Sequence, residues 1–270
     1  MIDMKLIDCC MFNGDEIIKM RLEYFYNFFD EFYFTESWYT FTGKRKPFLY
    51  CEKYAEWFAP YKDKIKFHIV DTLISTNPWE QEKHQRNAVV PRILSEHSDA
   101  MVFFSDCDEV YDIKTLPSNE QLSEIKTKVV HVTMKLYQCR FTNVQTLMSW
   151  TNAFFLHTSL LQNTPNIHEL RIYKTQNKNR VPSQRIVSGW HFSYFMNTDE
   201  IIRKVESYSH QEINLPIYKN KEVIQENMNQ AKDLFNRNVK VEYIGFDDPF
   251  HGYPELFRKY HVKLTQEGSC

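Results

Sequence analysis

The sequence contains little glycine, and neither sign of charge is in marked excess. Only 6 of the 270 residues are Gly, and no G-x-G-x-x-G string or P-loop occurs, so a glycine-rich phosphate-binding loop is not expected. The 33 Lys and Arg residues nearly balance the 35 Asp and Glu residues, for a formal net charge of −2. This balance argues against nucleic acid as a partner, because such binding usually needs a strongly basic face.

Long apolar runs and paired cysteines are missing as well. No run approaches the roughly 18–20 residues that a membrane span needs, and charges interrupt residues 1–8 too often for a signal peptide. The 6 cysteines form no C-x-x-C pair and no zinc-type spacing, and the chain has no Asn-x-Ser/Thr sequon. These features predict a soluble, cytoplasmic protein without a membrane span.

Aromatic residues, in contrast, are abundant. They make up 16% of the chain, within a hydrophobic fraction of 43%. A sizeable aromatic core is therefore expected, and exposed members of the set would suit stacking on sugar rings.

Strand-like and helix-like segments alternate along the first half of the chain. Apolar runs predict strands, and segments with helical spacing of apolar residues separate them. Pro91 is expected to bend or divide the second helix. Alternation of this kind predicts a mostly parallel sheet with crossover helices. The predicted strands are residues 5–12, 31–35, 65–70 and 100–105, and the predicted helices are 15–29 and 80–96.

The second half has a different pattern, with β-like segments closer together and helices near the end. We expect a mixed sheet there, a loop at residues 174–185, and one α/β domain over residues 1–270. Residues 1–110 would form a Rossmann-like, nucleotide-binding half and residues 111–270 an elaborated acceptor-side half. The predicted strands are 129–141, 149–161 and 170–175, and the predicted helices are 199–208 and 221–236.

The most distinctive local motif is Asp106-Cys107-Asp108, directly after the predicted strand at residues 100–105. The carboxyl ends of parallel strands are where open α/β sheets bind ligands. Two carboxylates in a turn can share a hard divalent cation, which in turn binds phosphate oxygens. A solvated acidic turn explains the same string, and the motif alone does not decide between the two.

A second motif places His191 among aromatic residues at positions 189–195. A histidine in such a segment is often only a buried, hydrogen-bonded side chain. Imidazole also suits Mn²⁺-type sites beside carboxylates, and Gly189 allows close backbone approach. Both interpretations of His191 stay open at this point.

Further charged residues are less specific. Asp199 and Glu200 begin a predicted helix, where acids often serve as caps, and Glu212 lies beyond its end. Lys44, Arg45 and Arg86 have the charge to contact phosphate, but most such residues face water. No G-x-S-x-G or H-E-x-x-H signature is present.

These segments together resemble glycosyltransferase family 17, which includes the bisecting β-1,4-mannosyl-glycoprotein β-1,4-N-acetylglucosaminyltransferases. The resemblance spans about residues 8–212. It consists of an ordered set of motifs: Phe12-Asn13, Glu16, Arg21, Asp30-Glu31-Phe32, Glu36-Ser37, Thr40, Gly43, Pro47, Trp79, Glu82, Arg86, Asp106-Cys107-Asp108-Glu109, Gly189-Trp190-His191-Phe192-Ser193, Ile201, Lys204 and Ser207.

The resemblance implies a GT-A fold, a UDP-sugar donor, a divalent metal, commonly Mn²⁺ (or Mg²⁺), and inversion at the anomeric carbon. N-acetylglucosamine is the default donor sugar, and a glycan is the acceptor. Two departures stand out. Glu109-Val110-Tyr111 replaces the usual Glu-Ile-Pro, and the region after the helix at 199–208 does not resemble the animal members. Those members are Golgi-anchored, whereas this chain is expected to be a soluble relative.

We therefore expect a metal-dependent inverting glycosyltransferase. Asp106 and Asp108 would bind the cation on the donor diphosphate, with Asp108 the more direct ligand and His191 the third. The metal would stabilise charge on the leaving UDP. Glu36 would accept hydrogen bonds from the nucleoside, and Arg86 with Lys44 or Arg45 would neutralise the pyrophosphate.

Inversion by single displacement also needs a general base for the acceptor hydroxyl. Glu212 and Asp199 are the two candidates, and the sequence does not separate them. Trp38, Trp190 and Tyr194 are aromatic residues that would stack on sugars if they are not in the core.

Two other classes of function stay open. A metal-dependent nucleotide-sugar phosphohydrolase would use the same carboxylates and histidine, with water as the nucleophile, and would not need an acceptor. A non-catalytic glycan-binding protein would bind sugar through its aromatic residues and would bind neither UDP nor metal.

Overall fold

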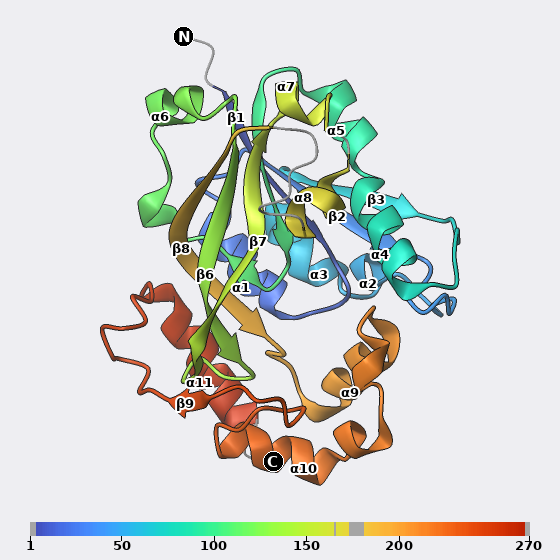
Figure 1. Ribbon diagram of the computed structural model, residues 1–270, viewed down its shortest axis with the longest axis vertical. Helices are drawn as coiled ribbons and strands as arrows, with labels where there is room; N and C mark the ends of the chain where they lie inside the picture. The colour runs from blue at the N-terminus through green and yellow to red at the C-terminus, as the bar shows by residue number, and fades with distance from the viewer. Residues whose placement is uncertain (1–3, 165, 173–180, 268–270) are drawn as a thin grey trace.

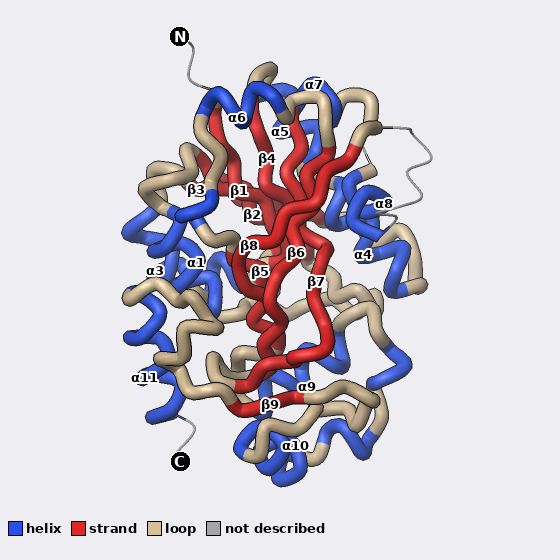
Figure 2. Tube along the Cα trace, turned by 60° about the vertical axis from the view of Figure 1, so that its left-hand side comes forward, coloured by secondary structure: helices blue, strands red, loops and turns tan. Residues whose placement is uncertain are grey.

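One mixed sheet forms the centre of the protein (Figures 1 and 2). The computed structural model describes residues 4–164, 166–172 and 181–267. The strands are β1 (Lys5–Met11), β2 (Glu31–Ser37), β3 (Ile65–Val70), β4 (Ala100–Asp106), β5 (Glu109–Val110), β6 (Val129–Gln138), β7 (Asn143–His157), β8 (Ser183–Ser193) and β9 (Val241–Tyr243). Their order is β3-β2-β1-β4-β7-β6-β8-β5, and β9 pairs with β7.

Helices pack around this sheet, and those of the last part of the chain, coloured orange and red, lie at its lower end in Figure 1. They are α1 (Ile17–Phe25), α2 (Tyr50–Lys53), α3 (Ala55–Phe58), α4 (Pro78–Asn87), α5 (Val90–Glu96), α6 (Asn119–Glu124), α7 (Thr158–Leu161), α8 (Ile167–Ile172), α9 (Thr198–Ser207), α10 (Lys221–Asn229) and α11 (Leu256–Glu267), with short 3₁₀ turns η1 (Ala59–Tyr61), η2 (Ile113–Thr115), η3 (Gln211–Ile213) and η4 (Pro216–Lys219). Within the described part of the chain, no helix combines the length and apolar character required to cross a bilayer.

The first half forms the parallel part of the sheet. β1 lies parallel to both β2 and β4, and β3 is parallel to β2. Pro91 lies in the first turn of α5, so it divides the segment into α4 and α5, because proline fits the first helical turn but not the interior. The predicted parallel half is confirmed.

The second half adds antiparallel pairs to the same sheet. β7 runs antiparallel to β4 and β6, whereas β6 and β8 are parallel, and β5 is antiparallel to β8. The sheet therefore continues from β3 to β5 without a break. The predicted α/β architecture, with a parallel first half and a mixed second half, is confirmed.

One predicted strand, residues 170–175, is wrong: residues 167–172 form the helix α8. The Asn166 side chain accepts a hydrogen bond from the backbone N–H of Glu169 at 3.2 Å, which begins a helix. Ile167 and Leu170, three residues apart, bury the same face. Residues 173–175 lie outside the described residues.

Several boundaries also differ from the prediction. β7 starts earlier than residue 149 and ends at His157, whose ring accepts a hydrogen bond from the backbone of Ser159 and begins α7. The predicted loop at 174–185 is wrong at its end, because Ser183 opens β8; residues 174–180 are outside the described residues. α10 ends at Asn229, well before residue 236.

Aromatic rings fill much of the core, as the composition predicted. The fully buried Phe257 of α11 has its ring centre 5.1 Å from that of Tyr24 on α1 and 5.2 Å from that of Trp190 on β8. The last helix therefore packs against both halves of the chain.

Candidate active site

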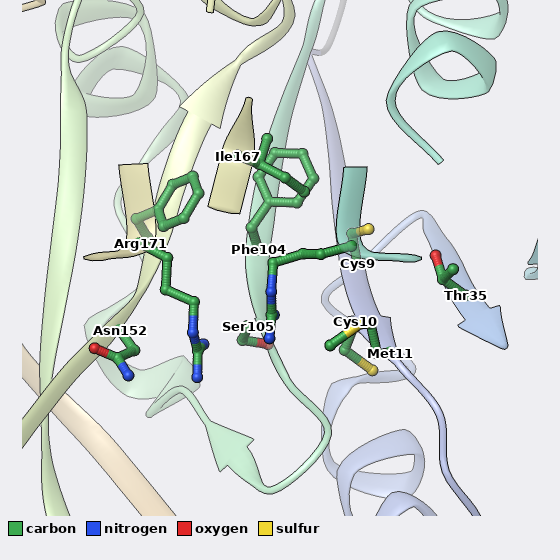
Figure 3. A pocket seen from close by; sticks show the side chains of 11 residues that line it. Cys9, Cys10, Met11, Thr35, Phe104, Ser105, Asn152, Ile167 and Arg171 are labelled. Atoms are coloured by element: carbon green, nitrogen blue, oxygen red, sulfur yellow. The ribbon is translucent and has the colours of Figure 1, made fainter. Parts of the chain in front are cut away.

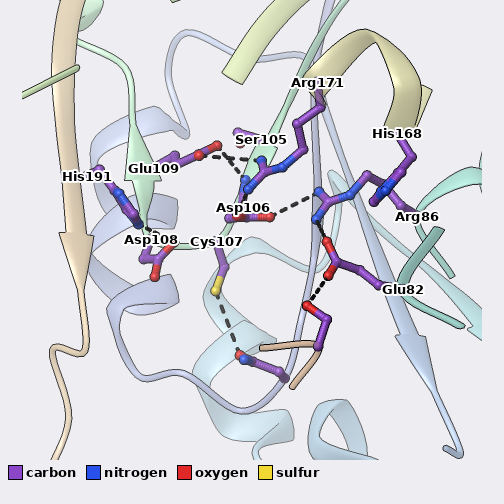
Figure 4. Close-up of polar contacts among 12 residues, drawn as sticks. Glu82, Arg86, Ser105, Asp106, Cys107, Asp108, Glu109, His168, Arg171 and His191 are labelled. Carbon is purple, nitrogen blue, oxygen red and sulfur yellow. Dashed lines mark hydrogen bonds and ion pairs between the residues drawn. The ribbon is translucent and has the colours of Figure 1, made fainter. Parts of the chain in front are cut away.

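The Asp106-Cys107-Asp108 turn lies at the carboxyl edge of the parallel strands (Figure 4). Asp106 ends β4 and pairs with Met11 at the end of β1. The short strand β5 follows at once, and there Glu109 pairs with His191 of β8. Segments far apart in the sequence therefore meet at the edge of the sheet where α/β proteins bind ligands.

Asp108 is buried between two cationic or potentially cationic partners. Its Oδ1 is 3.4 Å from His191 Nε2, and its Oδ2 accepts a hydrogen bond from Lys204 Nζ at 3.2 Å. Burial opposes ionisation, but Lys204 and His191 outweigh it and hold the pKa of Asp108 well below its usual range. The predicted proximity of His191 to this turn is confirmed.

His191 keeps one ring nitrogen unused. Its Nδ1 is buried without a hydrogen-bond partner among the described residues. The ring packs against Trp150, with 4.5 Å between ring centres. Packing therefore fixes the ring with Nε2 towards Asp108 and with Nδ1 unpartnered in the described part of the chain, an arrangement suited to a side chain that acts as a ligand.

Asp15 completes this cluster from the turn between β1 and α1. Its buried Oδ2 is 3.6 Å from Lys204 Nζ, and it accepts no hydrogen bond from the described residues. Burial raises the pKa of Asp15 to about 6, although Lys204 partly offsets that effect. No sequence motif pointed to Asp15, because an acid at a turn has no distinctive pattern.

Asp106 has a different environment from Asp108. Its Oδ1 accepts a hydrogen bond from Arg86 at 3.0 Å, and its Oδ2 is paired with Arg171. Burial opposes the two guanidinium groups, but they lower the pKa of Asp106 to about 2. Arg86 also binds Glu82 at 2.8 Å. Both oxygens of Asp106 therefore already have cationic partners.

Arg21 binds the backbone of the Asp106-Cys107-Asp108 turn. It forms a fully buried ion pair with Asp8, with Nε 2.8 Å from Oδ2. It also donates to the carbonyl oxygens of Asp106, at 3.0 Å, and of Glu109. Breaking a buried pair is strongly destabilising, so this pair keeps the turn in place.

Glu109 connects the turn to β7 and α8. Its carboxylate accepts hydrogen bonds from the Trp150 indole, from Arg171 at 3.4 Å and from the backbone N–H of Asp106 at 2.7 Å. Burial raises the pKa of Glu109 despite Arg171. No sequence signal pointed to Arg171, because this residue belongs to the segment that was wrongly predicted as a strand.

A hollow opens beside the two arginines, near the ends of β1, β2 and β4 (Figure 3). Arg86 and Arg171 provide its positive charge, and the remaining lining is mostly apolar. The lining residues are Cys9, Cys10, Met11, Thr35, Arg86, Phe104, Ser105, Asn152, Phe154, Ile167 and Arg171.

The ligand atoms of the three predicted metal ligands, Asp106, Asp108 and His191, do not form one close group in the structure. Among the described residues, the one group of three ligand-type side chains with all ligand atoms within 4.8 Å of one another is Glu31, Glu96 and His97. Lys66 already binds both carboxylates of that group, at 2.6 and 2.5 Å. Asp108 and His191 thus remain as the close pair at the turn.

Glu36, predicted to bind the nucleoside, has its carboxylate fully buried and occupied. It accepts hydrogen bonds from Lys46 at 2.6 Å and from the backbone N–H groups of Tyr50 and Cys51, at the start of α2. Lys44 and Arg45 are exposed on the following loop, where Arg45 lies over the Trp38 ring at 5.3 Å. Their contacts with a donor stay predictions.

Asp199 and Glu212 lie in different surroundings. Asp199 is exposed and pairs with Lys221 of α10 at 2.5 Å. The N-cap of α9 is Asn197, and Glu200 completes its capping box, so the capping role predicted for Glu200 is confirmed.

Glu212 belongs to the loop after α9, which lies beside α4. Its Oε1 is 2.6 Å from His210 Nδ1, and the His210 ring contacts that of Trp79, with 4.6 Å between ring centres. In the same loop, the Ser209 hydroxyl donates to Glu82. Glu82 in turn binds Arg86, and Arg86 binds Asp106. The loop that carries Glu212 is therefore connected to the Asp106-Cys107-Asp108 turn through these side chains.

Two of the aromatic residues considered for sugar stacking are in the core. Trp190 is only 2% exposed, and its indole N–H donates to the carbonyl of His251 at 2.8 Å. Tyr194 is also buried, with Lys204 Nζ 5.0 Å from its ring centre. Stacking of either ring on a sugar is therefore excluded in this conformation.

Comparison with known proteins identifies the family. The model of glycosyltransferase family 17 matches residues 2–251. The chain belongs to this family. No curated protein sequence matches the chain significantly.

Similar solved structures include two distant ones. HddC from Yersinia pseudotuberculosis is 8% identical, with a TM-score of 0.42 over 73% of this chain and 96% of that chain. A glycosyltransferase involved in the glycosylation of the major capsid of PBCV-1 is 12% identical, with a TM-score of 0.34 over 68% of this chain and 81% of that chain. Both TM-scores are low, so the functional assignment depends on the family and on the geometry of the site.

Proposed function

We propose that this glycosyltransferase is metal-dependent and inverting, and that it moves a sugar, N-acetylglucosamine by default, from a UDP-sugar to a glycan acceptor. The observation that carries the proposal is the buried carboxylate of Asp108, 3.4 Å from His191 at the carboxyl edge of the parallel strands. Family membership supplies the reaction class.

The pair of Asp108 and His191 supports a divalent cation at this turn, although Asp106 does not join the pair. Asp108 Oδ1 and His191 Nε2 are 3.4 Å apart, close to the separation of neighbouring ligands on one ion. The buried Oδ2 of Asp15 accepts no hydrogen bond from the described residues. Carboxylate oxygen with imidazole nitrogen suits Mn²⁺. Asp108 and His191 would hold the ion, which when bound would neutralise charge on the leaving diphosphate.

Asp106 has a positioning role in this proposal. Because Arg86 and Arg171 occupy its two oxygens, it fixes the two guanidinium groups at the edge of the hollow. Planar guanidinium groups bind phosphate oxygens well. Arg86 would thus meet the pyrophosphate, as the sequence suggested, and Arg171 joins it.

Glu212 is favoured over Asp199 as the general base. It lies in the loop beside α4, whereas Asp199 pairs with Lys221 on the far helix α10. Burial opposes the ionisation of Glu212, but the hydrogen bond with His210 outweighs this effect and lowers the pKa of Glu212. Glu212 is therefore ionised at neutral pH, as a base must be when the acceptor arrives.

A thermal-shift panel of nucleoside diphosphates and sugar nucleotides, with and without Mn²⁺, tests the proposal. A true donor should raise the melting temperature, since ligand binding stabilises the native state. UDP-sugars with Mn²⁺ should give the largest shift, and turnover should require a glycan acceptor. Donor breakdown without acceptor would instead identify a phosphohydrolase, and no response to UDP would indicate a glycan-binding protein.

Asp108→Asn should abolish turnover and weaken Mn²⁺-dependent UDP binding by at least about tenfold, since it removes a ligand charge. Circular dichroism should show a folded protein. Asp247→Asn, which changes an exposed acid paired with Arg258, is the matched control and should behave as wild type. Normal UDP–Mn²⁺ binding by the Asp108 variant, measured by calorimetry, would exclude Asp108 as a ligand.

A further inference from the structure

A lysine ammonium stands at the centre of the proposed metal site. Lys204 Nζ lies 3.2 Å from Asp108 Oδ2 and 3.6 Å from Asp15 Oδ2. The two acidic side chains are only 6% and 1% exposed. Lys204 comes from α9, whereas Asp15 precedes α1 and Asp108 follows β4, so a single cation joins three separate parts of the fold.

The charge balance explains this arrangement. Two buried carboxylates close to each other repel, and an uncompensated buried charge is costly. The ammonium provides the compensation, but it satisfies the two acids unequally. It donates a hydrogen bond to Asp108, while Asp15 Oδ2 accepts none from the described residues. The other oxygen of Asp15, Oδ1, accepts a hydrogen bond from the backbone N–H of Ile17 at 3.3 Å, so Oδ2 is the oxygen available for a closer cation.

We propose that Lys204 is the resident counter-cation of this centre, and that a divalent cation competes with it for Asp108 and Asp15. This inference rests on the proposed function and adds Asp15 and Lys204 to its site. An ion beside Asp108 and His191 would repel the ammonium a few ångströms away. The flexible side chain of Lys204 allows it to leave, and the released ammonium becomes available to the donor diphosphate.

The decisive experiment is a Mn²⁺ titration without nucleotide, followed by the electron paramagnetic resonance signal of free Mn²⁺. Lys204→Met should bind Mn²⁺ at least about tenfold more tightly than wild type, because the competing positive charge is gone. Lys204→Arg keeps the charge and should stay within about threefold of wild type. Lys219→Met removes a lysine that pairs with Glu206 of α9 outside the cluster and should leave the affinity unchanged.

The outcomes separate this inference from the proposed function. If wild type binds Mn²⁺ and Lys204→Met binds it no more tightly, the competition is overturned and the metal proposal stands. If neither protein binds Mn²⁺, the metal proposal fails and the competition fails with it. Tighter binding by Lys219→Met as well would show a general charge effect and overturn the inference.

A second measurement uses the wild-type protein and does not depend on the folding of any variant. Acetic anhydride modifies accessible lysines, and peptide mass spectrometry reports the extent at each one. Lys204 should be protected in the metal-free protein and should react several times faster when Mg²⁺ is saturating. Lys219 should react equally in both conditions. Equal reactivity of Lys204 with and without Mg²⁺ would overturn the proposal.

Discussion

At the scale of single residues, the two acids of the Asp-x-Asp motif have different tasks. Asp106 is held by Arg86 and Arg171, whereas Asp108 faces His191 and Lys204. Two acids separated by a single residue therefore differ in how available their oxygens are to a ligand. The difference comes from which elements supply the cations: α4 and α8 for Asp106, and β8 and α9 for Asp108.

Asp106→Asn should destabilise the fold in a pH-dependent way. The folded pKa of Asp106 is about 2, below the ordinary 3.8, so its ionised form contributes stability above pH 4, and this contribution is lost as the pH falls towards 2. We expect the variant to be about 2–3 kcal/mol less stable at pH 7. Urea denaturation between pH 7 and pH 3 measures the difference, which should shrink below pH 4. A difference that stays constant with pH would contradict the assignment.

The two candidate bases give the next prediction. Glu212→Gln should lower kcat by roughly 10²–10⁴-fold with little change in UDP affinity or melting temperature, because the base contacts the acceptor and not the donor. Asp199→Asn should keep wild-type activity and stability, since Asn197 and not Asp199 caps α9. The reverse result would assign the role to Asp199, and full activity of both variants would place the base elsewhere.

At the scale of secondary-structure elements, the antiparallel pairing of β5 with β8 shapes the site. Gly189 has φ of +80°, and a Cβ built there would lie 2.2 Å from the carbonyl oxygen of Val110. Only glycine allows this approach. This close approach of β8 to β5 allows Val110 to pair with Trp190 and Glu109 to pair with His191. The pairing in turn positions His191 beside Asp108.

Gly189→Ala should therefore cost about 3 kcal/mol or more, from backbone strain together with the clash. It should also weaken Mn²⁺ binding, because β8 carries His191. Gly245→Ala is the matched control, since no atom lies within 4 Å of its Cβ position. Chemical denaturation of both variants measures the effect. A Gly189 variant as stable as the control would show that β8 can shift without a loss of folding stability.

At the scale of the whole molecule, one sheet and one aromatic core join the two halves of the sequence. The C-terminal helix α11 returns to α1, where Tyr260 donates a hydrogen bond to Glu23 at 2.7 Å. The ring of Phe257 lies between Tyr24 of the first half and Trp190 of the second. Unfolding of either half would expose this shared core.

Phe257→Ala should lower the stability by about 3–5 kcal/mol, as expected for a large buried ring. Unfolding should remain one transition, with fluorescence and circular dichroism curves that coincide. Phe250→Ala, at a ring that is 44% exposed, should cost about 1 kcal/mol or less. Two separate transitions in the wild-type protein would contradict a shared core.

The sequence by itself determined the order of β1 to β4, α1 and the segment that forms α4 and α5, but not the short helices α2 and α3. It also determined the position of the Asp-x-Asp motif after a buried strand, and the family. Apolar periodicity is a local property, so it predicts β1 to β4 and α1 well. It failed at residues 170–172, which form part of α8 and not a strand, because a short buried helix and a short strand have similar composition.

Only the tertiary structure decided which charges meet. Arg171 is 65 residues from Asp106, and Lys204 is 96 residues from Asp108. Partners at such separations depend on the strand order of the sheet and on how α8 and α9 pack at its edge. Asp15 and Lys204 joined the site for this reason. The energy of a buried charge depends on its neighbours in space, and those neighbours are set by the fold as a whole.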